Sequence, residues 1–253
     1  MATAQTVFKR YEKKYLLNQT QYERMLTFLN DYMKQDEYGL HTIRNIYYDT
    51  DEYDLIRTSL GKPLYKEKFR VRSYSQVSEM DTVFLELKKK YDGVVYKRRE
   101  ALTLAEADAY LKYGYQPLKN GQIMHEIDWF LNINDIMPKV FIAYDRIALF
   151  SEEDPNLRVT FDHNIRFRDY DLSLSSPAYG KKLLEHDRYL MELKIGNAMP
   201  LWLSQYLARE NIFQTSYSKY GTCYTNYLFY KKLAVINRPD YDYSLQKGGI
   251  YCA

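Results

Sequence analysis

Cysteine is scarce in this chain, and a long apolar run is missing from it. Two cysteines, Cys223 and Cys252, occur in 253 residues. That is too few for a disulfide framework, so we expect free thiols in a reducing compartment. The longest apolar stretch, residues 140–150, is interrupted by an Asp-Arg pair and is too short to cross a bilayer. Residues 1–15 have no apolar core and no cleavage site of small residues, so we expect no signal peptide and a cytoplasmic location.

Several motifs of phosphate and metal chemistry are also missing. The sequence has no Gly-rich phosphate loop and no protein-kinase signature set, which excludes both of those enzyme classes. Its four histidines are scattered without metal-ligand spacing, and no serine or cysteine lies in a nucleophile motif. The formal net charge of +3 is too small to indicate nucleic-acid binding. The placement of charge along the chain is therefore more informative than its sum.

No repeat, low-complexity run or Pro/Gly/Ser-rich linker divides the chain. We expect a single domain over residues 1–231 and a C-terminal tail over residues 232–253. Alternation of apolar and polar residues predicts strands at 8–17, 42–48, 66–74, 82–90, 94–101, 139–150, 156–168 and 189–195. Helices are predicted from a cap at Asn18 or Thr20 to about residue 33, and at 104–113, 122–131, 201–210 and 219–231, while residues 48–51 read as a turn.

These elements predict an α+β fold. About eight strands in mostly antiparallel order are enough to close a small barrel. We therefore expect a closed antiparallel β-barrel of about eight strands that forms a tunnel, with the helices packed outside it.

Lysine and arginine recur at every second residue of several predicted strands. Side chains two residues apart share one face of a strand. The residues that share a face on successive strands are Arg10, Glu12 and Lys14; Lys66, Lys68, Arg70 and Arg72; Glu86, Lys88 and Lys90; Lys97 and Arg99; Tyr144 and Arg146; Arg158, Thr160 and Asp162; and Glu192 and Lys194. Cations therefore dominate this face, and an acidic residue accompanies them on some strands.

A face with so many like charges predicts a polyanionic ligand. Like charges directly opposite one another destabilise a sheet unless a ligand of opposite charge lies between them. A barrel interior is too narrow for a nucleic-acid duplex, so a triphosphate or linear polyphosphate fits better. We expect the few carboxylates to hold a hard divalent cation that bridges phosphate oxygens. For any one strand, a solvated or ion-paired face stays an open alternative.

The ordered set of these residues resembles the VTC (vacuolar transporter chaperone) polyphosphate polymerase domain, one of the CYTH-like triphosphate tunnel metalloenzymes. The resemblance covers about residues 7–231. The segments that carry it are Arg10-Tyr-Glu-Lys-Lys14, Tyr47-Tyr-Asp-Thr50, Phe69-Arg-Val-Arg72, Glu86-Leu-Lys88, Lys97-Arg-Arg99, Tyr144-Asp-Arg146, Arg158-Val-Thr-Phe-Asp162, Glu192-Leu-Lys194 and Ser218-Lys219. The resemblance implies a tunnel in which the γ-phosphate of ATP is transferred to a growing inorganic polyphosphate chain with Mn²⁺ or Mg²⁺.

The same resemblance implies roles for particular residues. It implies catalytic, phosphate-binding roles for Arg70, Arg72, Lys88, Arg146 and Arg158, and a metal-holding catalytic role for Glu192. It implies substrate binding by Lys14, Lys97, Tyr144, Ser218 and Lys219, and the strand-face pattern adds Lys68, Lys90, Arg99 and Lys194. The expected partners are ATP and inorganic polyphosphate, with no nucleic acid. A separate membrane-protein partner is expected if synthesis is coupled to export, and the oligomeric state is left open.

One departure bears on the reaction. Hydrolases of the wider superfamily carry Glu-x-Glu-x-Lys on the first strand, whereas this chain has Arg10-x-Glu12-x-Lys14. The basic residue favours a product-holding polymerase over a two-metal hydrolase. Two alternatives remain: hydrolysis of inorganic or nucleoside triphosphate at the same site, or a non-catalytic module that binds polyphosphate or nucleotide.

Overall fold

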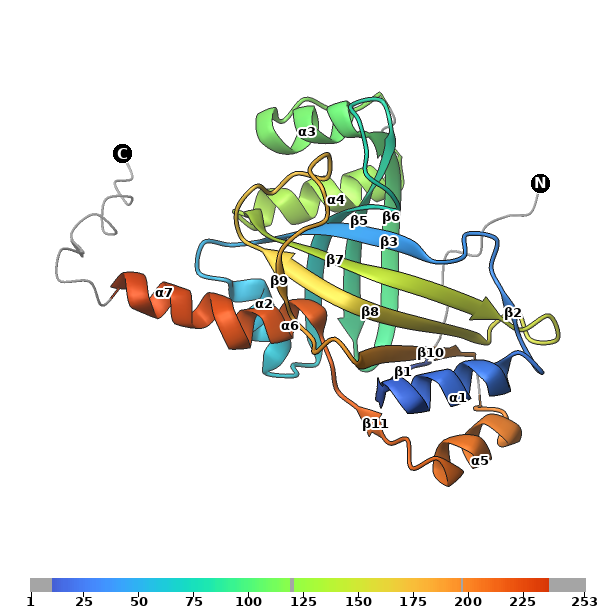
Figure 1. Cartoon of the computed structure of the whole chain (residues 1–253). Helices are drawn as coiled ribbons and strands as arrows, with labels where there is room; N and C mark the ends of the chain where they lie inside the picture. Colours follow the sequence, from blue (N-terminus) through green and yellow to red (C-terminus); the bar gives the residue numbers. More distant parts are fainter. Residues whose placement is uncertain (1–10, 119–120, 197, 237–253) are drawn as a thin grey trace, which may run out of the picture.

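A computed structural model describes residues 11–118, 121–196 and 198–236 of the chain (Figure 1). The long strands are β1 (Tyr11–Asn18), β3 (His41–Asp49), β4 (Tyr65–Ser73), β5 (Thr82–Tyr91), β6 (Val94–Thr103), β7 (Met137–Phe150), β8 (Arg158–Arg168) and β10 (Arg188–Ile195). Three two-residue strands are β2 (Lys34–Gln35), β9 (Lys181–Lys182) and β11 (Gln214–Thr215). The helices are α1 (Gln19–Leu29), α2 (Asp54–Leu60), α3 (Leu104–Tyr113), α4 (Gln122–Ile133), α5 (Leu201–Arg209), α6 (Lys219–Cys223), the π-helix η1 (Tyr224–Leu228) and α7 (Phe229–Ile236).

All the strands join one antiparallel sheet, which confirms the α+β class but not the closed barrel. The hydrogen-bonded order is β11-β1-β10-β8-β7-β3-β4-β5-β6, with β2 on β7 and β9 on β8. Among the described residues no ladder joins β6 to β1, so the expectation of closure is wrong. The outer edge of β1 is taken at Lys14 and Tyr15 by β11 instead. At those two residues the backbone edge of β1 is not available to β6.

The open sheet is nevertheless strongly curved. β1 and β5 lie far apart in the strand order, yet Lys88 Nζ on β5 comes within 3.7 Å of a Glu12 carboxylate oxygen on β1. Figure 1 shows β5 and β6 standing upright across the long diagonal strands β7 and β8. The right-handed twist of neighbouring strands accumulates in this way in large sheets. We call the face toward which the sheet curves the inner face. It carries Glu12, Lys88 and the other charged side chains that the two-residue alternation placed on one face.

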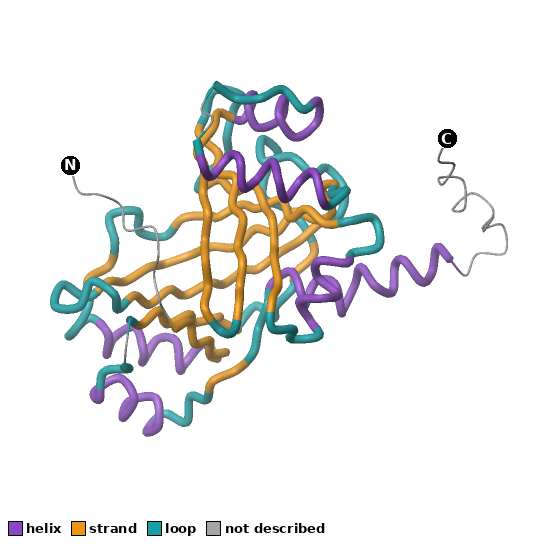
Figure 2. Tube along the Cα trace, turned by 180° about the vertical axis from the view of Figure 1, so that it is seen from behind, coloured by secondary structure: helices purple, strands orange, loops and turns teal. Residues whose placement is uncertain are grey.

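Apolar clusters lie on both faces of the sheet. The helices lie against the sheet at separate places (Figure 2). The outer face of β4, β5 and β6 packs on α3 and α4, for example through Tyr110 and Phe130. The outer face of β1, β8 and β10 packs on α1 and α5 through Met25 and Leu203. A third cluster lies on the inner face, where α2, α6 and η1 cover the apolar end of β3, β7 and β8. The rest of the inner face is therefore left for the charged side chains.

Two helices, α1 and α3, begin at capping residues that can be identified in the sequence. Asn18 Oδ1 accepts the backbone N–H of Gln21 at 2.8 Å, and the Gln21 side chain returns a bond to Asn18 N, which is a capping box. The predicted cap at Asn18 is thus confirmed, although α1 ends at Leu29 rather than near residue 33. Thr103 and Glu106 form a second capping box before α3.

Helix α2 lies just after the predicted turn at 48–51 and was missed. The fully buried carboxylate of Asp49 accepts backbone N–H groups of Leu55 and Ile56 at 2.9 and 3.0 Å, and the Tyr220 hydroxyl donates to it at 2.9 Å. A cap six or seven residues before the amides it binds has no local sequence signature. Asp49 therefore joins α2 to α6, which fixes the position of α6 against the inner face.

The remaining strand and hairpin predictions agree with the structure within a few residues, including the β5–β6 and β7–β8 hairpins. The predicted first strand began at residue 8, and Arg10 with residues 1–9 lies outside the described residues. The helical segment predicted from 219 is divided into α6, η1 and α7, and it continues past residue 231 to Ile236. The rest of the predicted tail, 237–253, also lies outside the description. No helix among the described residues has the length and apolarity needed to span a membrane.

Candidate phosphate-binding site

One buried carboxylate gathers four cations at the first of two charged groups on the inner face. Glu86 on β5 is 1% exposed. It accepts Arg70 Nε at 2.8 Å from β4 and Arg99 Nε at 2.8 Å from β6, and Lys97 Nζ lies 2.6 Å away. Arg72 Nε is 3.7 Å from the same carboxylate. Burial raises the pKa of Glu86, but these four cations outweigh it and hold the pKa well below its usual range. We call Glu86, Arg70, Arg72, Lys97 and Arg99 the Glu86 group.

The second group is built on two buried carboxylates. Asp162 on β8 binds Arg146 through two bonds of 2.5 and 2.6 Å, and Lys219 Nζ lies 2.5 Å from it. Glu192 on β10 lies 3.1 Å from Lys14 Nζ, 3.2 Å from Lys219 Nζ and 3.5 Å from Arg146. The two carboxylates raise the pKa of Lys219 although its burial lowers it. We call these five residues the Asp162–Glu192 group.

Aromatic hydroxyls and one amide connect the two groups. Arg72 donates through Nη2 to the Tyr144 hydroxyl at 3.1 Å and through Nε to Asn45 Oδ1 at 2.9 Å. Lys219 Nζ lies 4.4 Å from the centre of the Tyr144 ring, which places this ring between both groups. Arg70 donates to the Tyr47 hydroxyl at 2.9 Å. The arginine planes are therefore fixed in direction before any ligand arrives.

Several lysines of the inner face have no carboxylate of their own. Within the part of the chain that the structure describes, Lys68 and Lys194 form no ion pair shorter than 4 Å. Lys68 Nζ instead lies 3.2 Å from the Ser218 hydroxyl, which also caps α6. Burial, followed by repulsion from Lys88 and Lys66, lowers the pKa of Lys68 to about 7. Burial and Arg146 lower the pKa of Lys194 to about 8, against the opposing pull of Glu192 and Glu12. The inner face thus holds more positive charge than its own acids neutralise.

Most of the predicted site residues are brought together by the sheet. The two groups contain Arg70, Arg72, Arg146, Glu192, Lys14, Lys97, Arg99 and Lys219 of the predicted set. Lys88, Lys68, Tyr144, Lys194 and Ser218 adjoin them. Lys90 lies farther along β5, opposite Lys66 and near the β5–β6 turn.

Arg158 does not join either group. Its guanidinium lies 2.9 Å from Asp36 in the β2–β3 connection, and its side chain is 48% exposed. The strand alternation placed Arg158 on the correct strand but could not show this partner, because Asp36 is distant in sequence.

Four residues organise these cations in ways that sequence reasoning did not predict: the inward carboxylates Glu86 and Asp162 were expected to hold a metal ion but are paired with cations, and Tyr47 and Asn45 were given no role. Glu86 and Asp162 anchor the two groups, and Tyr47 and Asn45 orient Arg70 and Arg72. A carboxylate flanked by cations two residues away was visible in Glu86-x-Lys88. Tyr47 and Asn45 share a face of β3 by the same alternation, and that signal could have found them.

The site fits a divalent metal only together with bound phosphate. No group of three or more His, Cys, Asp or Glu residues within the described ranges could hold an ion. Mg²⁺ and related ions often use one or two carboxylates and complete their coordination with substrate phosphates and water. Asp162 is paired with Arg146 and Lys219, whereas Glu192 Oε2 lies 3.5 Å from Arg146 and takes no part in the contacts that Lys14 and Lys219 make with Oε1. Glu192 is therefore the carboxylate best placed to contribute to such a complex.

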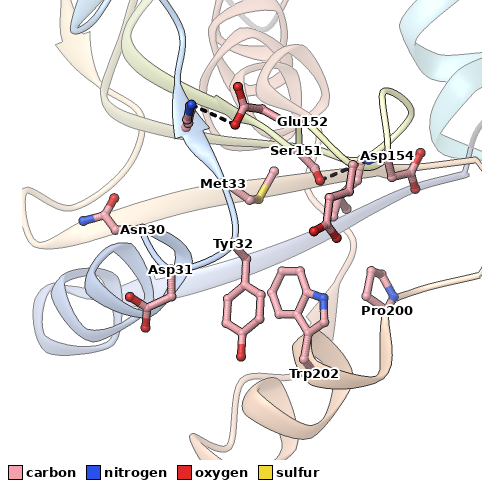
Figure 3. Close-up of a pocket in the computed structure, with 12 residues that line it drawn as sticks. Asn30, Asp31, Tyr32, Met33, Ser151, Glu152, Asp154, Pro200 and Trp202 are labelled. Carbon is pink, nitrogen blue, oxygen red and sulfur yellow. Dashed lines mark hydrogen bonds and ion pairs between the residues drawn. The ribbon is translucent and has the colours of Figure 1, made fainter.

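A pocket of about 420 Å³ lies beside α1 and α5, away from the inner face (Figure 3). Asp31, Glu152, Glu153 and Asp154 contribute carboxylates to its lining. Tyr32 and Trp202 stack there with ring centres 4.1 Å apart. These carboxylates repel a polyanion, and we therefore do not expect phosphate chemistry in this pocket.

Comparisons with known proteins agree with the resemblance. The model of a family described as the VTC domain matches residues 9–228. No curated protein matches the sequence. Among solved structures, the chain is similar to a candidate adenylate cyclase from Bacillus halodurans, with 17% identity, a TM-score of 0.55, and coverage of 85% of this chain and 96% of that one. This likeness shows a shared fold.

Two further solved structures match more weakly. A candidate adenylate cyclase from Vibrio parahaemolyticus has 12% identity and a TM-score of 0.43, with 85% of this chain and 98% of that chain covered. The Mimivirus capping enzyme triphosphatase has 10% identity and a TM-score of 0.35, with coverage of 80% and 88%. The family match, which spans most of the chain, carries the assignment.

Proposed function

This chain belongs to the VTC domain family, and from that premise we propose that it is a polyphosphate polymerase. It is an ATP-dependent phosphotransferase that moves the γ-phosphate of ATP onto a growing chain of inorganic polyphosphate. The reaction takes place on the cationic inner face, between the Glu86 group and the Asp162–Glu192 group.

The excess of cations on the inner face is the observation that carries this proposal. Glu86 alone is surrounded by four cations, and Lys68 has a lowered pKa because it is buried and because its cationic neighbours repel its charge. A face built only for internal ion pairs would balance its charges, since repulsion between buried cations costs stability. A bound polyanion removes that repulsion. Linear phosphate chains carry a charge on every unit and suit a row of such cations.

The chemistry follows from positioning and charge neutralisation, which dominate phosphoryl transfer. Arg70, Arg72 and Arg99 bind the ATP phosphates through planar guanidinium groups, whose geometry matches phosphate oxygens. The terminal oxyanion of the acceptor chain attacks the γ-phosphorus in line. The bond from that phosphorus to the β–γ bridging oxygen breaks, ADP leaves with that oxygen, and the chain is longer by one phosphate. No protein base is needed because the attacking phosphate is already ionised.

The Asp162–Glu192 group contributes on the other side of the transferred phosphate. Lys14 and Lys219 form ion pairs with Glu192, and Tyr144 lies between Lys219 and Arg72. These cations hold the acceptor chain against the donor by cancelling the repulsion between the two anions. A divalent ion carried by the phosphates and held by Glu192 would neutralise further charge. Arg158 receives no role at the donor phosphates, since Asp36 holds it at the rim.

The test is incubation of the purified full chain with ATP and Mn²⁺, followed by gel electrophoresis and staining for polyphosphate. We expect long product from the native protein and a loss of at least about 100-fold in Arg70→Ala, because the variant lacks one donor that stabilises the charge of the transition state. Arg24→Ala is the matched control, because Arg24 on α1 is an exposed arginine paired with Glu210. Undiminished synthesis by Arg70→Ala would show that the site is misplaced.

Other products would favour the alternatives. Phosphate and ADP without polymer would indicate a triphosphate hydrolase at the same site. Tight binding of polyphosphate without consumption of ATP, unchanged after Glu192→Gln, would indicate a binding module. If synthesis occurs only with added membranes, a separate membrane-protein partner is supported.

A further inference from the structure

Aromatic rings line the end of the inner face that the helices α2 and α6 leave uncovered. Tyr74 follows β4, two residues after Arg72, and its ring centre lies 5.6 Å from that of Phe84 on β5. His41 at the start of β3 lies 6.3 Å from the Tyr74 ring, and Tyr38 lies 6.1 Å from His41. These four rings form a continuous row, which we call the aromatic rim.

The aromatic rim borders directly on the Glu86 group. Arg99 donates to the Tyr74 hydroxyl at 2.6 Å, and its guanidinium carbon lies 4.5 Å from the centre of the Phe84 ring. Arg72 lies 6.0 Å from the Tyr74 ring centre. A ligand that stacks on Tyr74 therefore places any attached phosphates beside two arginines that point into the inner face.

The rim is reachable from solvent at Tyr74 and Tyr38, while His41 and Phe84 are half-buried, and it differs in this from the buried aromatic residues at the other end. Tyr74 is 39% exposed and Tyr38 is 68% exposed. At the opposite end the Tyr47 ring stacks on Tyr220 of α6 at 4.9 Å, and both rings are buried. Exposed planar rings next to cations are the arrangement that proteins use to stack nucleobases, because every base presents a π-face. At the end covered by α2 and α6, the faces of Tyr47 and Tyr220 are buried against each other and are not accessible to a base.

We infer that the aromatic rim is the subsite for the base of a nucleoside triphosphate, with Tyr74 as the stacking residue. The inference rests on the proposed function, since it takes the Glu86 group as the site of the donor phosphates. It adds that the donor is selected as a nucleotide: inorganic triphosphate fills only the cationic part, whereas the nucleotide uses the rim as well.

The experiment measures dissociation constants of ATP and of inorganic tripolyphosphate for the full chain by titration calorimetry without catalytic metal. Tyr74→Leu removes the ring, and Tyr74→Phe keeps the ring while losing the same hydroxyl contact to Arg99. We expect Tyr74→Leu to weaken ATP binding by about tenfold, because the variant loses the stacking of the base on one aromatic ring. Tripolyphosphate binding should change by less than about twofold in both variants. ATP binding by Tyr74→Phe should stay within about threefold of the native protein.

Tyr91→Leu is the matched control, because Tyr91 is a half-exposed tyrosine at the far end of β5. Equal weakening of both ligands in Tyr74→Leu would mean that Tyr74 acts only through Arg99, and the inference is overturned. Unchanged binding of both ligands would overturn it too, while leaving the phosphate site intact. Failure of the native protein to bind tripolyphosphate at all would refute the proposed function itself and the inference with it.

Discussion

The two charged groups of the inner face differ in how their cations are balanced. In the Glu86 group one buried carboxylate serves four cations, and the side chains of Arg70, Lys97 and Arg99 are 21%, 41% and 34% exposed. In the Asp162–Glu192 group two carboxylates serve three cations, and Arg146 and Lys219 are both buried. The second group approaches internal neutrality, whereas the first does not.

The difference indicates a division of work. Cations that are in excess and accessible to solvent can bind an incoming polyanion without breaking strong ion pairs, because the single carboxylate beside them does not neutralise their charge. Cations that are buried and paired hold α6 against the sheet, since Lys219 belongs to α6 while Asp162 and Glu192 belong to the strands. We therefore expect ligand binding to depend most on the Glu86 group, and the position of α6 to depend on the other.

The largest effect on stability is expected from Glu86→Gln. Loss of the shared carboxylate leaves Arg70, Arg99 and Lys97 repelling one another, and removal of one partner from a buried ion pair costs about 3 kcal/mol of unfolding free energy. Equilibrium unfolding in guanidinium chloride measures this loss of unfolding free energy. Saturating tripolyphosphate should restore much of the stability, since the ligand supplies the missing negative charge.

Asp108→Asn is the control for that measurement. Asp108 forms an exposed pair with Lys112 on α3, and such a pair contributes less than about 0.5 kcal/mol. If Glu86→Gln is no more destabilising than Asp108→Asn, or if tripolyphosphate does not stabilise it, the charge excess of the Glu86 group has been misjudged.

A smaller loss of stability and a specific loss of metal response are expected from Glu192→Gln. Asp162 still binds Arg146 and Lys219 in this variant, so the cost in unfolding free energy is about 1–2 kcal/mol. Tripolyphosphate binding without metal should persist, while the stimulation of turnover by Mn²⁺ or Mg²⁺ should disappear. Titration of activity with each ion checks this, and a native metal response in Glu192→Gln would remove Glu192 from the metal site.

The effect that is smallest per step of the measurement is a gradual dependence on pH, to which Lys68 contributes. Its pKa is about 7 in the folded protein because of burial and of repulsion from Lys88, Lys66, Lys14 and Arg70, and about 10.4 in an unfolded chain. Between these values the unfolded state binds more protons, so the stability of the free protein rises with pH, by at most about 1.4 kcal/mol per pH unit. Polyanion binding favours the protonated lysine, so affinity for tripolyphosphate should fall over the same interval.

Lys68→Met is the comparison for the pH experiment. Unfolding and tripolyphosphate titrations from pH 6.5 to 9 should show both trends in the native chain and weaker trends in the variant. Because the pKa values of Lys97 and Lys194 are also lowered, to about 7 and about 8, part of the dependence should remain. Opposite slopes for stability and affinity would support the excess-cation description, and parallel slopes would contradict it.

The amino-acid sequence by itself determined which side chains share the inner face and where most strands and helices lie. Side-chain alternation has a fixed period of two residues, so Lys68, Arg70 and Arg72 had to point the same way once β4 formed. The capping boxes at Asn18 and Thr103 span three residues and were equally readable. These features are local, and a local rule needs no knowledge of the rest of the chain.

Tertiary structure alone decided which cations meet, which end is open and whether the sheet closes. Arg158 lies on the predicted face, yet Asp36 holds it outside both groups. Asp49 and Tyr220 fix α6 over one end of the inner face, and His41 and Tyr74 come together at the other. β11 pairs with the outer edge of β1 at Lys14 and Tyr15, and no ladder joins the described residues of β6 to β1. Each outcome depends on the twist of the sheet and on contacts between residues far apart in sequence, and neither of these is encoded in a two-residue alternation.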